Sequence, residues 1–283
     1  MTSTHQPTEH EIEDHDRGLL FDLGTLANRR GALRLFGGIG LLALTGCSTG
    51  SSGTTATTTT SGSASSSSAA TAGDCVDEVP QETAGPYPGD GSNGPNVLTE
   101  SDIVRSDITT SFGSSSGAAE GVPLTVKLTV QDASCAPLSG AAVYVWHCDR
   151  DGGYSLYSGG VTDQNYLRGV QAADDTGTVT FTSIFPGCYS GRWPHIHFEV
   201  YKSLSEATAS GQIAATSQIA LPQDACEKVY TTSGYEQSVT NLSRVSLSSD
   251  NVFGDDGGAK QLATMTGDPT SGYTAALTVS VAA

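Results

Sequence analysis

The sequence predicts an all-β fold, a sandwich or a barrel, for the part of the chain that begins at Cys75. Apolar and polar residues alternate in short runs, clusters of Gly, Pro, Asn and Asp separate the runs, and no stretch sustains the period of an amphipathic helix. The alternation marks five strands, at residues 124–130, 143–146, 179–182, 196–200 and 277–281. Turns are expected between them, for example at residues 151–153 and 174–177. The tail, residues 231–283, is rich in Ser and Gly, and only the last of these strands is expected there.

The N-terminal part of the chain has the features of an export signal rather than of a folded domain. Arg29 and Arg30 precede a short apolar stretch, residues 35–45, as in a twin-arginine signal peptide, and Leu44-Thr45-Gly46-Cys47 matches the lipobox of bacterial lipoproteins. Residues 48–72 contain only Ser, Thr, Gly and Ala, too little apolar content to fold. We therefore expect a signal peptide at 1–46, a lipidated Cys47 and linker at 47–74, and one folded domain at 75–283. The domain would be exported and anchored by lipid on the outer face of the bacterial cytoplasmic membrane.

The charge of the chain argues against a nucleic-acid partner. The sequence has 13 Lys and Arg against 30 Asp and Glu, a net charge of −17, and removal of residues 1–46 (4 basic, 6 acidic) leaves 9 against 24, or −15. Such an acidic domain repels phosphate backbones and anionic lipid. No run of 18 apolar residues exists, so membrane contact is expected only through the lipid.

Residues 189–197 contain a group of side chains that could bind a metal. This segment holds Tyr189, Arg192, His195 and His197 within nine residues. Residues 195–201 are expected to form a strand, on which His195 and His197 point to the same face. Tyr154, after Gly152 and Gly153, offers a second phenol. Two phenolates and two imidazoles favour Fe(III) over Fe(II) or zinc, whose sites use carboxylate or cysteine.

With these residues the chain resembles the intradiol ring-cleavage dioxygenases, which include protocatechuate 3,4-dioxygenase and catechol 1,2-dioxygenase. The resemblance runs from about Glu82 to Gln218. It is carried, in family order, by residues 82–87 (Glu-Thr-Ala-Gly-Pro-Tyr), 140–146, 152–154, 168–169, 175–177, 182–189 and 192–198. It implies a mixed β-sandwich of the prealbumin-like type. It also implies one mononuclear nonhaem Fe(III), held by Tyr154, Tyr189, His195 and His197.

The same resemblance implies roles and a reaction. Tyr189 and His195 would be axial ligands, and Tyr189 would leave the metal and act as a base. Arg192 would lie beside the substrate ring and stabilise the charge that develops on the substrate. Gln218 would contact the residues around the metal ligands rather than the metal itself. Tyr87 would line the substrate pocket. Both atoms of O₂ would enter a catechol-type aromatic, whose ring opens to a cis,cis-muconate. The loop from Tyr189 to His195 looks shorter than in the familiar enzymes, which predicts an open cleft and bulky or substituted catechols.

Other functions are compatible with single parts of this pattern. A tyrosine on a strand usually packs, a His-x-His pair is often exposed, and an arginine is usually a surface charge. The alternatives are a non-catalytic exported sandwich that binds catechol-type ligands or metal, a copper or zinc protein using only the His-x-His pair, and a structural surface domain. Since the two tyrosines, two histidines and Arg192 occur together in family order, we favour the enzyme. His147 should face away from Trp146 and Cys148, and we expect it to be structural.

Cysteine pairing and oligomeric state are less constrained. Five cysteines follow Cys47, an odd number, so at most two bridges form within the chain: Cys75, Cys135, Cys148, Cys188 and Cys226. Cys148 and Cys188 each precede a predicted iron tyrosine, and we hypothesise that they form a bridge. The chain lacks the N-terminal helical segment with which catechol 1,2-dioxygenases dimerise. We therefore expect a monomer or an unfamiliar oligomer.

Overall fold

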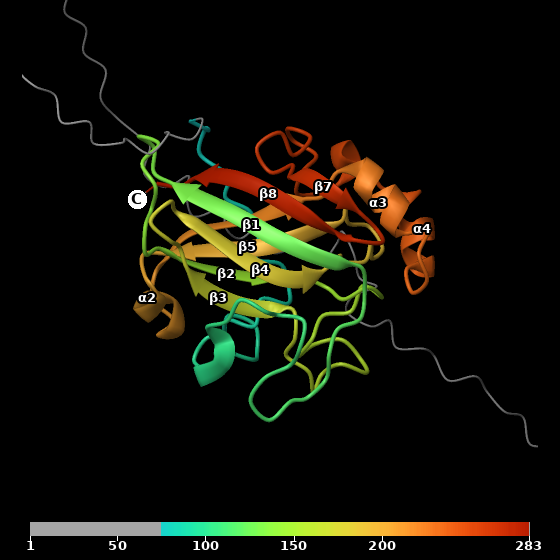
Figure 1. The fold of residues 1–283 in the computed structure, drawn as a ribbon, viewed down its shortest axis with the longest axis horizontal. Coiled ribbons are helices and arrows are strands. Elements are labelled where there is room, and N and C mark those ends of the chain that lie inside the picture. The colour runs from blue at the N-terminus through green and yellow to red at the C-terminus, as the bar shows by residue number, and fades with distance from the viewer. Residues whose placement is uncertain (1–74, 283) are drawn as a thin grey trace, which may run out of the picture.

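The computed structural model describes residues 75–282, so the predicted signal peptide, Cys47 and the linker lie outside the described residues (Figure 1). The described part contains eight strands in two four-stranded sheets, ordered β4-β1-β8-β7 and β3-β2-β5-β6. The strands are β1 (Pro123–Gln131), β2 (Ala142–Trp146), β3 (Arg168–Ala172), β4 (Thr178–Ile184), β5 (His195–Tyr201), β6 (Ile213–Ala220), β7 (Thr264–Asp268) and β8 (Gly272–Ser280). The helices are η3 (Ser101–Ile103), α2 (Leu204–Thr208), α3 (Gln223–Val229), α4 (Glu236–Leu242) and η4 (Leu247–Ser249). None of these helices is long and apolar enough to cross a membrane.

The first sheet makes the sandwich mixed, as expected. Strand β1 pairs in parallel with β8 and antiparallel with β4, and β7 and β8 form an antiparallel pair at the edge. Along β1 the side chains of Leu124, Val126, Leu128 and Val130 are buried at every second position. The alternation predicted from the sequence therefore presents one face of this sheet to the core.

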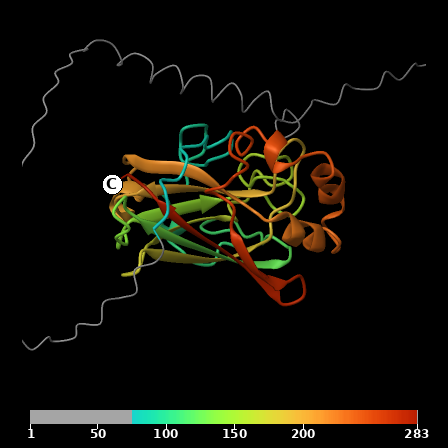
Figure 2. The same cartoon turned by 90° about the horizontal axis from the view of Figure 1, so that it is seen from above.

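The second sheet is buried on both faces. Every residue of β2 and of β5 is buried. Val143, Val145, Ile196 and Phe198 belong to the core between the two sheets, which lie face to face in Figure 2. The intervening residues of β2, such as Trp146, belong to a second apolar cluster that also includes Tyr87 and Tyr154. The outer face of this sheet is thus covered by loops, and it is the face that carries His195 and His197.

The five predicted strands are confirmed as β1, β2, β4, β5 and β8, whereas β3, β6 and β7 were not predicted. Strand β6 reads Ile-Ala-Ala-Thr-Ser-Gln-Ile-Ala, in which small residues hide the alternation. The expectation of a single strand in residues 231–283 was wrong, because α4, η4 and β7 also lie there. Helices α3 and α4 gather at one end of the sandwich (Figures 1 and 2).

The hypothesised Cys148–Cys188 bridge is wrong. The structure pairs Cys75 with Cys135, and Cys148, Cys188 and Cys226 are buried free thiols. The two loops do meet, since Gly187 N donates to Asp149 O over 2.9 Å. However, the thiol of Cys148 points to Gly187 O and that of Cys188 to Arg192 O, each over 3.5 Å. Burial raises the pKa of Cys188 to about 12, which keeps that thiol protonated and unreactive.

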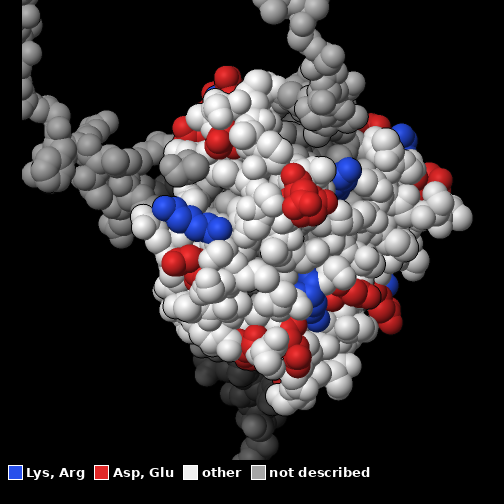
Figure 3. Space-filling view, turned by 60° about the vertical axis from the view of Figure 1, so that its left-hand side comes forward, with Lys and Arg blue, Asp and Glu red and all other residues white. Residues whose placement is uncertain are grey.

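The surface carries few basic groups. On the face shown in Figure 3, Lys and Arg residues lie apart from one another among uncharged side chains and acidic groups. No basic stripe crosses this face, in keeping with the net charge of −17 for the whole chain. The face shown therefore lacks the row of Lys and Arg side chains with which proteins bind a phosphate backbone.

Candidate metal centre

The fold brings the four predicted metal ligands together around one atom, Nε2 of His195. His197 Nε2 lies 3.1 Å from it, Tyr189 Oη 3.2 Å and Tyr154 Oη 3.4 Å. The histidines come from β5, and the two tyrosines come from separate loops that are distant in sequence. Two phenol oxygens and a second imidazole nitrogen therefore surround His195 Nε2 at contact distance.

The strand and its neighbours fix both imidazoles. His195 Nδ1 donates a proton to the carbonyl of Trp193 over 2.5 Å, which leaves the lone pair on Nε2 directed at the cluster. His197 lies directly across from Trp146 on β2, and the two rings stack with centroids 4.9 Å apart and planes 7° apart. These contacts within the chain thus hold both rings in their orientation.

Glycines allow the two tyrosine loops to approach each other. Gly152 has φ +89°, and a Cβ built there would lie 3.0 Å from Cβ of Tyr189. At Gly187 a Cβ would lie 2.5 Å from the carbonyl oxygen of Arg150. Asp149 shapes the turn before Tyr154, because its Oδ1 accepts hydrogen bonds from Asp151 N (3.0 Å) and Gly153 N (2.8 Å). The glycines of the Gly-Gly-Tyr and Pro-Gly-Cys-Tyr motifs are therefore needed because a larger side chain would collide with the neighbouring loop.

The electrostatics of the cluster suit a hard, highly charged cation. Burial lowers the pKa of His195 to about 3 and that of His197 well below 6.5, so both imidazoles are neutral and keep their lone pairs. The two Nε2 atoms lie 3.1 Å apart, and Nδ1 of His197 has no hydrogen-bond partner among the described residues. Burial also raises the pKa of Tyr154 well above 10, so its phenol ionises only beside a strong Lewis acid. Ferric ion meets these requirements, and the residues present fit it.

No other metal-binding group competes with this cluster in the part of the chain that the structure describes. No set of three or more His, Cys, Asp and Glu side chains lies close enough there to hold an ion. Among the described residues, the two histidines lie beside phenols, whereas zinc sites are built from His, Cys and carboxylate.

Arg192 and Gln218 lie against the ligand cluster. Arg192 is buried, its Nη1 lies 3.5 Å from His195 Nε2, and its Nη2 donates to Gln218 Oε1 over 2.7 Å. Gln218 lies opposite His197 in the β5–β6 register, and its Nε2 donates to Thr83 O over 3.0 Å. Strand pairing thus places the predicted supporting glutamine beside the predicted substrate arginine.

Tyr87 packs on Tyr154, one of the candidate ligands. Its ring centroid lies 4.9 Å from that of Tyr154 and 5.2 Å from that of Tyr157. Gly85 in the same segment comes so close to His197 that a Cβ there would lie 3.2 Å from its Cε1. The segment at 82–87 therefore covers the ligands, and a contact between Tyr87 and substrate stays a prediction.

His147 lies outside the cluster. Its Nδ1 donates to Cys148 O and its Nε2 accepts from the hydroxyl of Ser183, both over 2.7 Å. Both ring nitrogens are thus used within the core, in keeping with the structural role expected for it.

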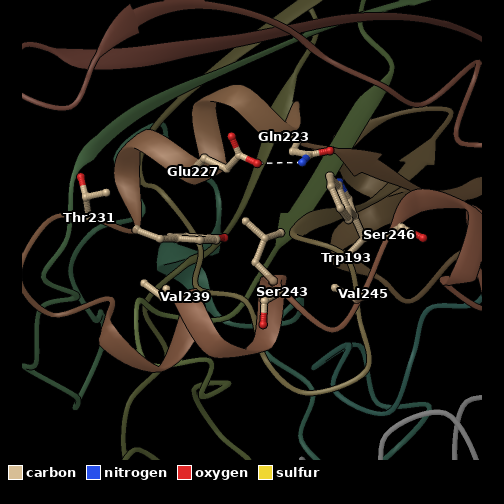
Figure 4. A pocket seen from close by; sticks show the side chains of 10 residues that line it. Trp193, Gln223, Glu227, Thr231, Val239, Ser243, Val245 and Ser246 are labelled. Atoms are coloured by element: carbon tan, nitrogen blue, oxygen red, sulfur yellow. Dashed lines mark hydrogen bonds between the residues drawn. The ribbon is translucent and has the colours of Figure 1, made fainter.

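Two cavities lie near the cluster. One, of about 540 Å³, has Tyr189 in its wall together with Asp149, Asp151, Gly153, Gln237 and Asn241. Tyr189 is partly exposed, whereas Tyr154 is 1% exposed. The other, of about 390 Å³, lies between α3 and α4 beside Trp193 and contains none of the four ligands (Figure 4). Of these two cavities, the first has one candidate ligand, Tyr189, in its wall.

The tail contributes two residues that sequence reasoning missed. Asp250 Oδ2 accepts hydrogen bonds from Arg192 Nε (3.0 Å) and Trp193 N (2.7 Å). The ring of Phe253 lies 6.5 Å from that of His195. Burial alone would raise the pKa of Asp250, but Arg192 and the Trp193 N–H outweigh it, so the pKa lies below 3.8. Nothing in the Ser-rich sequence around Asp250 signals this role.

The chain is similar in sequence to known dioxygenases. Residues 93–205, which include the four candidate ligands and Arg192, match a family model described as Dioxygenase. The chain is 41% identical over 61 residues to chlorocatechol 1,2-dioxygenase of Rhodococcus opacus and 38% identical over 60 residues to catechol 1,2-dioxygenase of Pseudomonas sp. strain EST1001. These alignments span 22% and 21% of this chain but only 24% and 20% of the two curated relatives.

A solved structure matches over a longer range. It is the intradiol ring-cleavage dioxygenase from Tetranychus urticae, with 28% identity and a TM-score of 0.58. The match covers 73% of this chain and 95% of that chain. The similarity thus extends over nearly the whole of that protein.

Proposed function

Because the chain belongs to the intradiol ring-cleavage dioxygenase family, we propose that it opens the ring of a catechol-type aromatic between the two hydroxylated carbons. Both atoms of O₂ would enter the product, a cis,cis-muconate. The observation that carries this proposal is the convergence of two phenols and two imidazoles, three of whose donor atoms lie within 3.4 Å of His195 Nε2.

The proposed cofactor is a single nonhaem Fe(III), held by Tyr154, Tyr189, His195 and His197. When bound, it would act as a Lewis acid on both oxygens of a catechol and make the ring reactive toward O₂. The chain supports this choice with two neutral imidazoles and with the buried phenol of Tyr154, which ionises only beside a strong Lewis acid.

The two tyrosines would have different tasks. Tyr154 is 1% exposed and packed under Tyr87, so it is fixed in place. Tyr189 is partly exposed, it lies in the wall of the 540 Å³ cavity, and its Oη lies 3.2 Å from His195 Nε2, so its phenolate would be the one to accept a proton from an entering catechol. The more exposed phenolate is therefore the base, in agreement with the role that the resemblance implies.

Arg192 would supply positive charge where the substrate gains negative charge. Its Nη1 lies 3.5 Å from His195 Nε2 and so faces the place where substrate oxygens would bind. The guanidinium is buried, and in this low-dielectric setting a fixed charge stabilises a transition state more strongly than in water. Gln218 accepts a hydrogen bond from Nη2 and helps to hold the group there.

We propose that the substrates include substituted catechols. The cavity at Tyr189, about 540 Å³, is within the usual range of about 300–1,000 Å³ for small-molecule sites and has room for a ring with side groups. Initial rates with catechol, protocatechuate and catechols of increasing substituent size would test this. A strong preference for protocatechuate over the substituted catechols would count against it.

We also propose export and lipid anchoring at Cys47. The Arg29-Arg30 pair and the lipobox support it, and the Cys75–Cys135 disulfide fits an oxidising compartment. Detergent partitioning of the full chain and of its Cys47→Ala variant, expressed in a bacterium, would test it. Equal recovery of both proteins in the aqueous phase would contradict lipidation.

The proposed activity is tested by visible spectroscopy of the purified protein after loading with ferric ion. Tyrosinate bound to Fe(III) gives a red charge-transfer band. We expect this band in the wild type, a shift when catechol is added without oxygen, and its return, with muconate formed, after oxygen is admitted. The band should weaken in Tyr154→Phe but not in the control Tyr157→Phe, because the Tyr157 hydroxyl contacts Gly89 N and Asn93 O rather than the cluster.

A wild-type protein that stays colourless with ferric ion would overturn the tyrosinate site and the activity. A red protein that binds catechol but forms no muconate would favour the alternative, a non-catalytic binding domain.

A further inference from the structure

Asp250, in the tail outside the family-matched residues 93–205, is built into the candidate site. It is 3% exposed and follows η4 directly. Its Oδ1 accepts hydrogen bonds from Val252 N (2.8 Å) and Phe253 N (3.1 Å), and its Oδ2 accepts from Trp193 N (2.7 Å). Hydrogen bonds from three backbone N–H groups therefore fix the position of the Asp250 carboxylate.

The fixed carboxylate orients the guanidinium of Arg192. Nε donates to Asp250 Oδ2 over 3.0 Å, and Nη2 donates to Gln218 Oε1 over 2.7 Å. Because a guanidinium is planar, holding Nε and Nη2 also determines the position of Nη1. That nitrogen lies 3.5 Å from His195 Nε2, at the ligand cluster.

The ion pair with Asp250 also stabilises the buried charge of Arg192. Arg192 is 1% exposed, and an unpaired guanidinium at such a site would be strongly destabilising. Gln218 carries no charge, whereas Asp250 provides the opposite one at 3.0 Å. Without the Asp250 carboxylate, the Arg192 side chain would regain rotamer freedom and turn toward solvent or toward other hydrogen-bond acceptors.

We propose that Asp250 is a positioning residue that holds Arg192 Nη1 at the ligand cluster, so that the tail completes the active site. The catalytic consequence rests on the proposed dioxygenase function, whereas the positioning itself does not. Asp250 touches no substrate, and its effect reaches the reaction only through Arg192. Its loss should therefore lower kcat more than it raises KM, since the catechol oxygens would bind the metal.

The test compares Asp250→Asn and Asp250→Glu with the wild type and with the control Asp256→Asn. Asp256 lies in the same tail and caps backbone N–H groups of Gly258 (2.7 Å) and Ala259 (3.2 Å), but it does not contact Arg192. For each full-chain protein one would measure iron content, the catechol-induced shift of the visible band, and steady-state kinetics. Before iron is added, hydrogen exchange of the Arg192 Nε–H would be followed by NMR on protein labelled at arginine nitrogens, with Arg192→Lys used to assign the signal.

We expect Asp250→Asn to keep its iron and its band shift, to lose protection of the Arg192 Nε–H, and to lower kcat on the order of 10²-fold, with KM changed less than about 2-fold. Asp256→Asn should match the wild type in all four measurements. Asp250→Glu keeps the charge but displaces it by one methylene, so it should fold and still lose most of kcat.

Three outcomes would overturn the proposal. The first is a folded Asp250→Asn variant with unchanged protection of the Arg192 Nε–H or unchanged kcat. The second is a rise in KM with kcat intact. The third is failure of both Asp250 variants to fold, which would show that the carboxylate serves the fold alone. If the wild type itself forms no muconate, the proposed function fails. The exchange measurement would then still decide whether Asp250 holds Arg192.

Discussion

Acidification should destabilise this protein through His147. The side chain is 1% exposed, and both ring nitrogens are hydrogen-bonded in the neutral form. Burial lowers the pKa of His147 to about 4, against 6.5 for an exposed histidine. Between these pH values the unfolded chain binds a proton that the folded chain does not, so the free energy of unfolding decreases as the pH falls from about 6.5 to about 4. At 1.36 kcal/mol per tenfold change in proton affinity, the loss is about 3 kcal/mol.

The assay is urea unfolding of metal-free wild type and His147→Gln at several pH values between about 7.5 and about 4, a range that spans the window set by the two pKa values. Trp146 and Trp193 are both buried, so tryptophan fluorescence reports the loss of the core. His195 and His197 also have lowered pKa values, of which burial is the largest cause and the charge of His147 a minor one, so most of their contribution is common to both proteins.

Glutamine does not titrate, so the variant should start with lower stability at neutral pH and then lose about 3 kcal/mol less than the wild type on acidification. Parallel stability curves for the two proteins would refute the reasoning, because they would show that His147 protonates equally in the folded and unfolded chains.

Three further predictions concern the site and the disulfide. Tyr189→Phe should keep part of the visible absorption of the iron-loaded protein but lower kcat about 10²–10⁴-fold, the range for loss of a general base, as initial rates would show. Replacing Cys75 and Cys135 by Ser should cost about 4 kcal/mol in guanidinium unfolding, because the bridge spans a sequence separation of 60; an unchanged midpoint would contradict this. Gly152→Ala should lower the iron content, since its Cβ would press on Tyr189 Cβ at 3.0 Å. The control Gly160→Ala has a similar φ of +86° but nothing within 4 Å of its Cβ, so it should only lower the free energy of unfolding by about 1–2 kcal/mol. Equal iron contents in the two glycine variants would refute the steric argument.

The strands were predictable where one face is buried and the other is not. Strands β1 and β4 alternate in burial, and their sequences alternate in polarity. Strand β3 begins with a buried arginine and a glycine, and β6 consists largely of small residues. Their burial comes from neighbouring strands and covering loops, so their own sequences carry little periodic signal.

The candidate ligands were predictable because their pattern is local. His195 and His197 need only the period of a strand to share a face, and each tyrosine follows glycines that a close approach requires. Gln218 was predictable only through resemblance, because its place opposite His197 depends on the β5–β6 register.

The sequence by itself determined the all-β class, five strands and the set of side chains that could hold a ferric ion, because these follow from periodicity and from short motifs. Only the tertiary structure decided that Cys75 pairs with Cys135, that Cys148 and Cys188 stay apart, and that Asp250 binds Arg192 over a separation of 58 residues. Contacts of this kind depend on how loops and the tail pack against the two sheets. Such packing is a property of the whole chain and leaves no mark in the residues next to each partner.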